Sequence, residues 1–180
     1  RYFRTKMSIE MKPQKKKNNA FIRRMVLLGA VGLVLFFIQC VPGVPIAVNG
    51  ITPNMLVALT TAVAFFFGEK AGGFYGLFAG ILLDMYSVSG LPVNAMLLLV
   101  LGCVCGLLAR LFFSRNFPAA LLCCLAYLFV YYGVCLLAFK GGLSDYGRAY
   151  FLSQSIPGIF YSLAFFVPWY FLCKKLSKGI

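Results

Sequence analysis

The sequence predicts an all-α protein, a polytopic bundle of about six transmembrane helices of which the second and third are short. Three observations predict this fold class. The chain is 62% hydrophobic and only 12% charged, whereas soluble domains carry about 25% charged residues. Its apolar runs are of a length that crosses a bilayer as helices, and the alternation of a membrane β-strand is absent. Its 17 Lys and Arg gather mainly at the two chain ends.

These basic residues divide the chain into three parts. Residues 1–24 carry nine of the 17 cations in a polar stretch without periodicity, so we expect a disordered cytoplasmic tail. Residues 25–173 form the expected helix bundle, and residues 174–180 form a second basic tail in the cytoplasm. The first tail is expected to set the orientation of the chain, with contact to anionic lipid headgroups as the alternative role. Nucleic acid is not expected as a partner, because no nucleic-acid-binding fold accompanies the charge.

Proline, glycine and charged residues break the apolar part into six segments. The expected helices cover residues 25–41, 52–67, 71–85, 92–113, 118–139 and 151–173. The first is expected to be a retained anchor, because no small-residue cleavage site follows it. The second and third hold 16 and 15 residues, fewer than the roughly 20 that cross about 30 Å of hydrocarbon. They are therefore expected either to cross a thinned bilayer or to form a re-entrant hairpin.

The distribution of cations predicts that both termini lie in the cytoplasm. Six crossings from a cytoplasmic N-terminus place 15 of the 17 Lys and Arg inside, and leave only Lys140 and Arg148 outside. The positive-inside rule favours this arrangement. Five crossings would require a helix through residues 89–92 and would export the basic C-terminal tail. The sequence therefore predicts a multi-pass membrane protein with its N-terminus and its C-terminus in the cytoplasm.

The titratable residues predict neither an enzyme nor a metal or cofactor site. The chain has no histidine, and its seven cysteines include no Cys-x-x-Cys pair, so they are expected to pack as small hydrophobes. An intramembrane aspartyl site made of Asp84 and Asp145 is disfavoured, because Asp145 lies in a glycine-flanked loop and neither acid occupies a catalytic motif. Aromatic residues of the fifth segment, such as Tyr131, are expected to pack in the core or to face lipid.

The third segment carries the most specific pattern in the chain. Small residues recur there every four positions and so form a stripe on one helix face. Small residues on a membrane helix let a second helix approach closely. We therefore expect helix packing, or partner binding, at the glycines of this segment: Gly72, Gly73, Gly76 and Gly80.

The stripe ends in the carboxylate of Asp84. This acid is costly near the C-terminus of a membrane helix, where the macrodipole is also negative. We expect it to accept hydrogen bonds from Ser87, Ser89 and Asn94, because the following turn brings the chain back beside it. The alternative is that Asp84 only marks the point where the helix meets water.

From residue 51 to residue 132, the order of these motifs resembles the MreD family of rod shape-determining membrane proteins. The resemblance rests on Pro53-Asn54, on the glycine pattern that ends at Asp84, and on the run Gly90-Leu91-Pro92-Val93-Asn94 that opens the next helix. The chain departs from the family where Asn54 stands for the usual Asp and Pro92 for the usual Gly.

The resemblance implies a non-enzymatic component of the bacterial cell-elongation machinery, embedded in the plasma (inner) membrane and without a cofactor. Such a protein binds the transmembrane helix and membrane-proximal region of the bitopic protein MreC. Through MreC it helps to couple MreB to peptidoglycan synthesis by RodA and a class B penicillin-binding protein. On this interpretation, Pro53, Asn54, Asp84 and Asn94 shape a crevice at the outer face.

A second interpretation comes from a different class of protein. The substrate-binding S component of an energy-coupling-factor vitamin transporter is similar in fold, length and helix number. S components usually carry Ala-x-x-x-Ala on the first helix, and residues 29–34 do not supply it. A vitamin in the outer crevice would need polar partners such as Asn94, Asp145 and Arg148, so this alternative remains open from the sequence.

Overall fold

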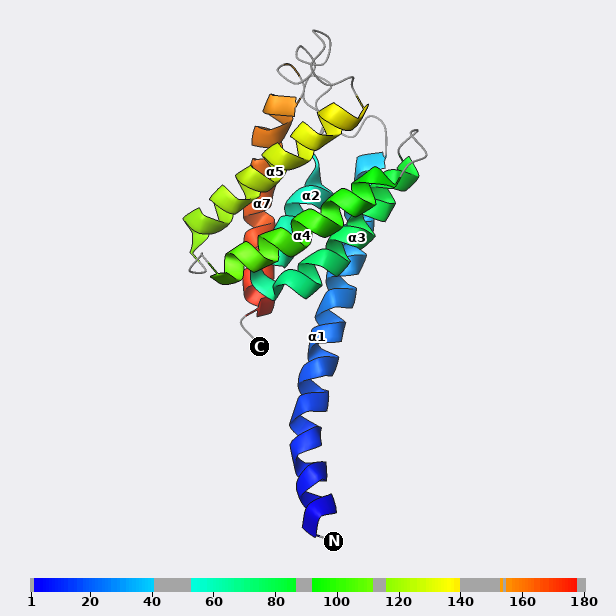
Figure 1. Ribbon diagram of the computed structural model, residues 1–180, viewed down its shortest axis with the longest axis vertical. Helices are drawn as coiled ribbons and strands as arrows, with labels where there is room; N and C mark the ends of the chain where they lie inside the picture. Colours follow the sequence, from blue (N-terminus) through cyan, green and yellow to red (C-terminus); the bar gives the residue numbers. More distant parts are fainter. Residues whose placement is uncertain are drawn as a thin grey trace.

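The protein is a bundle of helices, as the sequence predicted (Figure 1). The computed structural model describes residues 2–40, 53–86, 92–111, 116–139, 153 and 155–177, with side chains from residue 21 onward except at residues 138 and 139. These residues form no strand. Their six helices are α1 (Tyr2–Cys40), α2 (Met55–Phe67), α3 (Glu69–Tyr86), α4 (Val93–Leu111), α5 (Phe117–Phe139) and α7 (Ile156–Ser177). Four of them, α1, α4, α5 and α7, are long and apolar enough to cross a membrane.

The first helix begins earlier than the sequence led us to expect. Residues 2–24 were expected to be disordered, but α1 is helical from Tyr2 to Cys40. Its N-terminal half projects away from the other helices in Figure 1. The spanning part of α1 provides a nucleus, and extending an existing helix costs far less than starting one. This stretch also contains several residues of good helix propensity, although Pro13 within it removes one helical hydrogen bond.

The short helix α2 forms the centre of the bundle. It has 13 residues and is therefore about 20 Å long. All of them except Phe67 are buried, because α1, α3, α4, α5 and α7 all contact it. Its two threonines fit there because their hydroxyls donate to the carbonyls of Leu56 and Val57, at 2.8 and 2.9 Å. A short second helix was predicted, and its length is tolerated because α2 meets protein rather than lipid.

A tight turn at Gly68 reverses the chain between α2 and α3. Gly68 has a φ of 86°, a left-handed conformation that favours glycine. Its amide donates to the carbonyl of Ala64 at 3.0 Å, and its carbonyl accepts from Gly72 at 2.9 Å. The turn starts α3 at Glu69, so α3 has 18 residues rather than the 15 expected.

The described cations lie at one end of the bundle, which we call the basic end. There the ring of Phe21 in α1 lies 6.3 Å from that of Phe67 in α2. Arg110 at the end of α4 pairs with Glu69 at 3.3 Å, and Tyr170 of α7 lies against the last turn of α2. The Lys and Arg residues whose side chains the structure describes are Arg23, Arg24, Lys70, Arg110, Lys174 and Lys175. The opposite end, where α3 ends and α4 begins, is called the polar end.

Candidate functional site

The glycine stripe of α3 lies directly against the backbone of α4. A Cβ added to Gly72 would lie 2.7 Å from the carbonyl oxygen of Gly102. One added to Gly76 would lie 2.8 Å from the carbonyl carbon of Leu98, and one added to Gly80 would lie 2.6 Å from a carbonyl oxygen in the first turn of α4. Real Cβ atoms do not approach backbone this closely. Glycine is therefore required for α3 and α4 to pack at this distance.

Helix α4 carries a matching set of small residues that the sequence analysis did not single out. Gly102 faces Gly72, and a Cβ on Gly106 would lie 2.5 Å from the backbone nitrogen of Glu69. The signal was present, because Gly102 and Gly106 repeat the four-residue spacing of α3. Gly73, also predicted, faces the Cys103 side chain instead of backbone. The structure thus brings all four predicted glycines to a contact within the chain, between α3 and α4.

Asp84 closes the polar end of this helix pair by capping α4. Its Oδ1 accepts from the backbone amide of Asn94 at 3.1 Å and from the Asn94 side-chain Nδ2 at 2.9 Å. Its Oδ2 accepts from the amide of Ala95 at 2.8 Å. These amides belong to the first turn of α4, which has no intrahelical acceptors for them and carries the positive end of the macrodipole. Asn94 was a predicted donor, while Ser87 and Ser89 lie outside the described residues.

Asn94 connects Asp84 to α5 through a second set of contacts. It is 7% exposed, and its Oδ1 accepts from the hydroxyl of Tyr131 at 3.0 Å. The sulfur of Cys135, one turn further along α5, lies 3.8 Å from the same oxygen. Tyr131 was expected only to pack in the core or to face lipid. Its ring is buried as expected, but its hydroxyl joins two helices.

The N-terminus of α2 completes the polar end. Asn54 occupies the N-cap position, and its Oδ1 accepts from the amide of Val57 at 3.4 Å. Asparagine and aspartate serve equally well at an N-cap, which explains why Asn54 can replace the more usual acid. Its Nδ2 donates to the Tyr131 hydroxyl at 3.5 Å, and its backbone amide donates to Oγ of Ser162 in α7 at 2.8 Å. Gln39 of α1 donates to the carbonyl of Pro53 at 2.8 Å.

These contacts join the six described helices at one place. We call the set the polar network, and its members are Gln39, Asn54, Asp84, Asn94, Tyr131 and Ser162. The four residues predicted for the crevice, Pro53, Asn54, Asp84 and Asn94, all lie within it or adjoin it. The sequence did not identify the other three members, because none of them belongs to a motif or to a repeated spacing.

The chemistry of the polar network is that of fixed hydrogen bonds. The carboxylate of Asp84 accepts from three donors, which orients it toward α4. Among the residues that the structure describes, no group of three or more His, Cys, Asp or Glu is placed to hold a metal ion. Asp145, the second acid of the disfavoured aspartyl site, lies outside the described residues. The geometry therefore favours a site that fixes how helices meet.

Comparison with known proteins gives one match. A family model described as rod shape-determining protein MreD matches residues 19–179. The matched stretch covers the spanning part of α1, the helices α2, α3, α4, α5 and α7, and the whole polar network. No curated protein and no solved structure matches the chain.

Proposed function

This chain belongs to the MreD family of rod shape-determining proteins, and we propose that it binds the bitopic protein MreC. It is a multi-pass membrane component of the machinery that gives rod-shaped cells their form. The observation that carries the proposal is the family match over residues 19–179, which includes nearly all of the described bundle. The match favours this class over the vitamin-transporter alternative.

We further propose that the protein acts as a scaffold in the bacterial plasma membrane and not as an enzyme. Bound to MreC, it would couple cytoplasmic MreB to RodA and a class B penicillin-binding protein during peptidoglycan synthesis. Two features support a scaffold. The α3–α4 contact is made through backbone, and the polar network joins the six described helices. Both features make the bundle rigid, and a rigid bundle presents a fixed surface to a binding partner.

The face of α1 turned away from the bundle is the proposed contact for the transmembrane helix of MreC. Only 17% of the spanning part of α1 is buried, against 33 to 39% in the other three long spans. Leu27, Ala30, Val34 and Phe37 are all exposed on α1. Their spacing of three, four and three residues is that of a seam for a second helix. The small side chain of Ala30 lets that helix approach closely.

Replacing Ala30 with tryptophan is expected to reduce co-purification of MreC at least tenfold. The large ring would hold the partner helix away from the α1 face, and it meets no tightly packed residue of this chain because Ala30 is exposed. Tagged protein co-expressed with MreC would be purified in mild detergent and MreC quantified by immunoblot. The matched control is Val130→Trp on α5, which is 46% exposed and lies on another helix. Equal recovery of MreC with both variants would contradict the proposed face.

The basic end is proposed to face the cytoplasm, because cations near helix ends are retained there. In a cysteine-free background, a single cysteine is placed at Tyr86 or at Lys175. Tyr86→Cys, at the exposed end of α3 beside the polar network, is expected to react with a membrane-impermeant maleimide in intact protoplasts. Lys175→Cys is expected to react only after the membrane is permeabilised. The reverse pattern would show that the chain is inserted the other way.

A further inference from the structure

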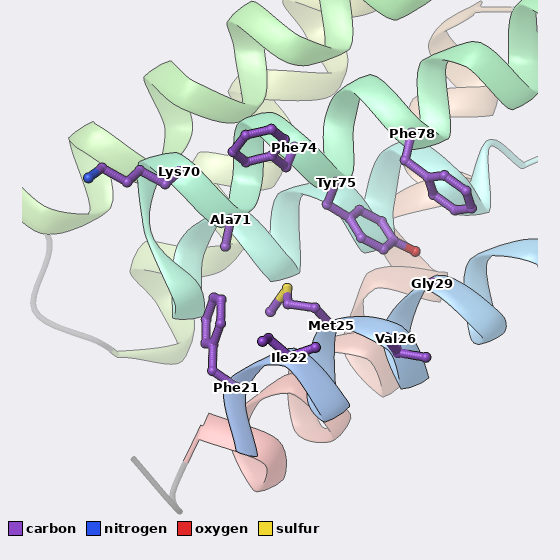
Figure 2. Close-up of a pocket in the computed structure, with 10 residues that line it drawn as sticks. All are labelled: Phe21, Ile22, Met25, Val26, Gly29, Lys70, Ala71, Phe74, Tyr75 and Phe78. Carbon is purple, nitrogen blue, oxygen red and sulfur yellow. The ribbon is translucent and has the colours of Figure 1, made fainter. Parts of the chain in front are cut away.

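An apolar groove of about 500 Å³ runs between α1 and α3 on the outside of the bundle (Figure 2). Ile22, Val26 and Gly29 line one side, and Phe74 and Phe78 line the other. The groove is open, because Val26 is 66% exposed and Phe74 is 75% exposed. In a membrane protein, such an opening faces the hydrocarbon of the bilayer. Apolar molecules of the bilayer therefore have direct access to it.

The floor of the groove offers no unsatisfied polar group. Tyr75 is 5% exposed, and its hydroxyl donates to the carbonyl of Leu28 in α1 at 3.1 Å. This contact requires Gly32, because a Cβ there would lie 2.5 Å from the Tyr75 hydroxyl oxygen. Among the described residues that line the groove, Tyr75 carries the only hydroxyl, and this hydroxyl is already bonded to α1. What remains for a ligand is an apolar slot.

One end of the groove is positively charged. Figure 2 shows Phe21 and Lys70 at the same end, with the Lys70 amine pointing outward beyond it. Lys70 lines the groove and is exposed. The acid beside Lys70, Glu69, is paired with Arg110 at 3.3 Å. Among the side chains that the structure describes, no carboxylate pairs with Lys70.

We propose that this groove binds one anionic phospholipid of the bilayer, with an acyl chain in the slot and the headgroup phosphate at the end marked by Lys70. The apolar lining fits a hydrocarbon chain, and the Lys70 ammonium group complements a phosphate. A helical partner fits less well. A transmembrane helix is roughly 10 Å across and 30 Å long, so it is several times larger than a groove of about 500 Å³.

Native mass spectrometry of the purified full chain tests this assignment. The protein would be titrated in mixed micelles with dioleoyl phosphatidylglycerol and, separately, with dioleoyl phosphatidylcholine. Wild type is expected to keep one phosphatidylglycerol at collision energies that remove phosphatidylcholine. Lys70→Gln is expected to reduce this preference about fivefold, the factor that one cation supplies at an anionic surface. Because Lys70 is exposed, this variant should fold like wild type.

A second variant tests the slot separately from the charge. Gly29 lines the groove, and no atom lies within 4 Å of a Cβ built on it, so Gly29→Phe places an aromatic ring in the slot. It is expected to reduce the bound phosphatidylglycerol at least tenfold. The control is Gly133→Phe on α5, where a Cβ also meets nothing within 4 Å, and it should bind lipid like wild type.

Three results would overturn the inference. Equal retention of the two lipids by wild type would exclude recognition of the headgroup. Unchanged phosphatidylglycerol in Gly29→Phe would exclude the slot. Loss of MreC from Gly29→Phe with lipid retained would show that the groove holds a partner helix. The lipid experiment needs no partner protein, so its failure would leave the proposed MreC contact at Ala30 untouched.

Discussion

Replacing Gly76 with alanine is expected to leave little folded protein, although it adds one methyl group. Gly76 lies at the centre of the α3–α4 contact, and a Cβ there would lie 2.8 Å from the Leu98 carbonyl carbon and 3.3 Å from the Leu99 amide nitrogen. Both atoms are backbone inside a helix, so neither moves without shifting α4. Overpacking of this kind typically costs about 1–3 kcal/mol, and more where the neighbours are rigid. We expect the upper part of that range.

Two other glycines make the experiment a graded series. Gly73→Ala meets the sulfur of Cys103, the end of a side chain that can rotate away, whereas Gly133→Ala meets nothing within 4 Å. We therefore expect the melting temperature to be highest for Gly133→Ala, lower for Gly73→Ala and lowest for Gly76→Ala. Fluorescence-detected size exclusion after heating measures this order in detergent extracts. If Gly76→Ala has the same melting temperature as Gly133→Ala, then α3 and α4 do not pack backbone against backbone.

The sequence was sufficient to predict those contacts that involve residues close together in the chain. The four-residue spacing of glycines in α3 predicted a close helix contact, and the turn after Asp84 predicted that Asn94 would lie beside it. Both depend on residues that are close in the chain, where helix geometry and a short turn determine distances. The sequence did not predict which helix packs against the glycine stripe. A stripe of small residues accepts α4 and a helix of another protein equally well.

The central position of α2 was also not predicted. A helix that is apolar on all faces either lies in a core or spans a membrane, so the apolar character of α2 did not distinguish burial in the bundle from contact with lipid. Its shortness was instead interpreted as thinning of the bilayer or as a re-entrant hairpin. The remaining members of the polar network, such as Tyr131 and Ser162, depend on which non-neighbouring helices cross. Sequence periodicity predicts that these side chains face a core, but it does not predict which of them contact one another.

Replacing Asp84 with alanine is expected to destabilise the bundle by about 2–4 kcal/mol, because it leaves three donors without their acceptor. Two of the donors are amides in the first turn of α4, and the third is the buried side chain of Asn94. Asp84→Asn keeps one carbonyl oxygen as an acceptor but removes the charge, so we expect about half of that loss. The same heating assay measures both variants.

The other acid of α3 provides the matched control. Glu69 pairs with Arg110, whose side chain is 72% exposed, and an exposed ion pair is worth about 0–1 kcal/mol. Glu69→Gln should therefore melt close to wild type. A double-mutant cycle with Asn94→Ala then identifies the contact. If Asp84 acts through the Asn94 side chain, the double variant loses less stability than the sum of the losses in the two single variants. Should Asp84→Ala melt like Glu69→Gln, the carboxylate would merely mark the end of α3 at the water boundary, and the polar network would no longer explain how six helices meet.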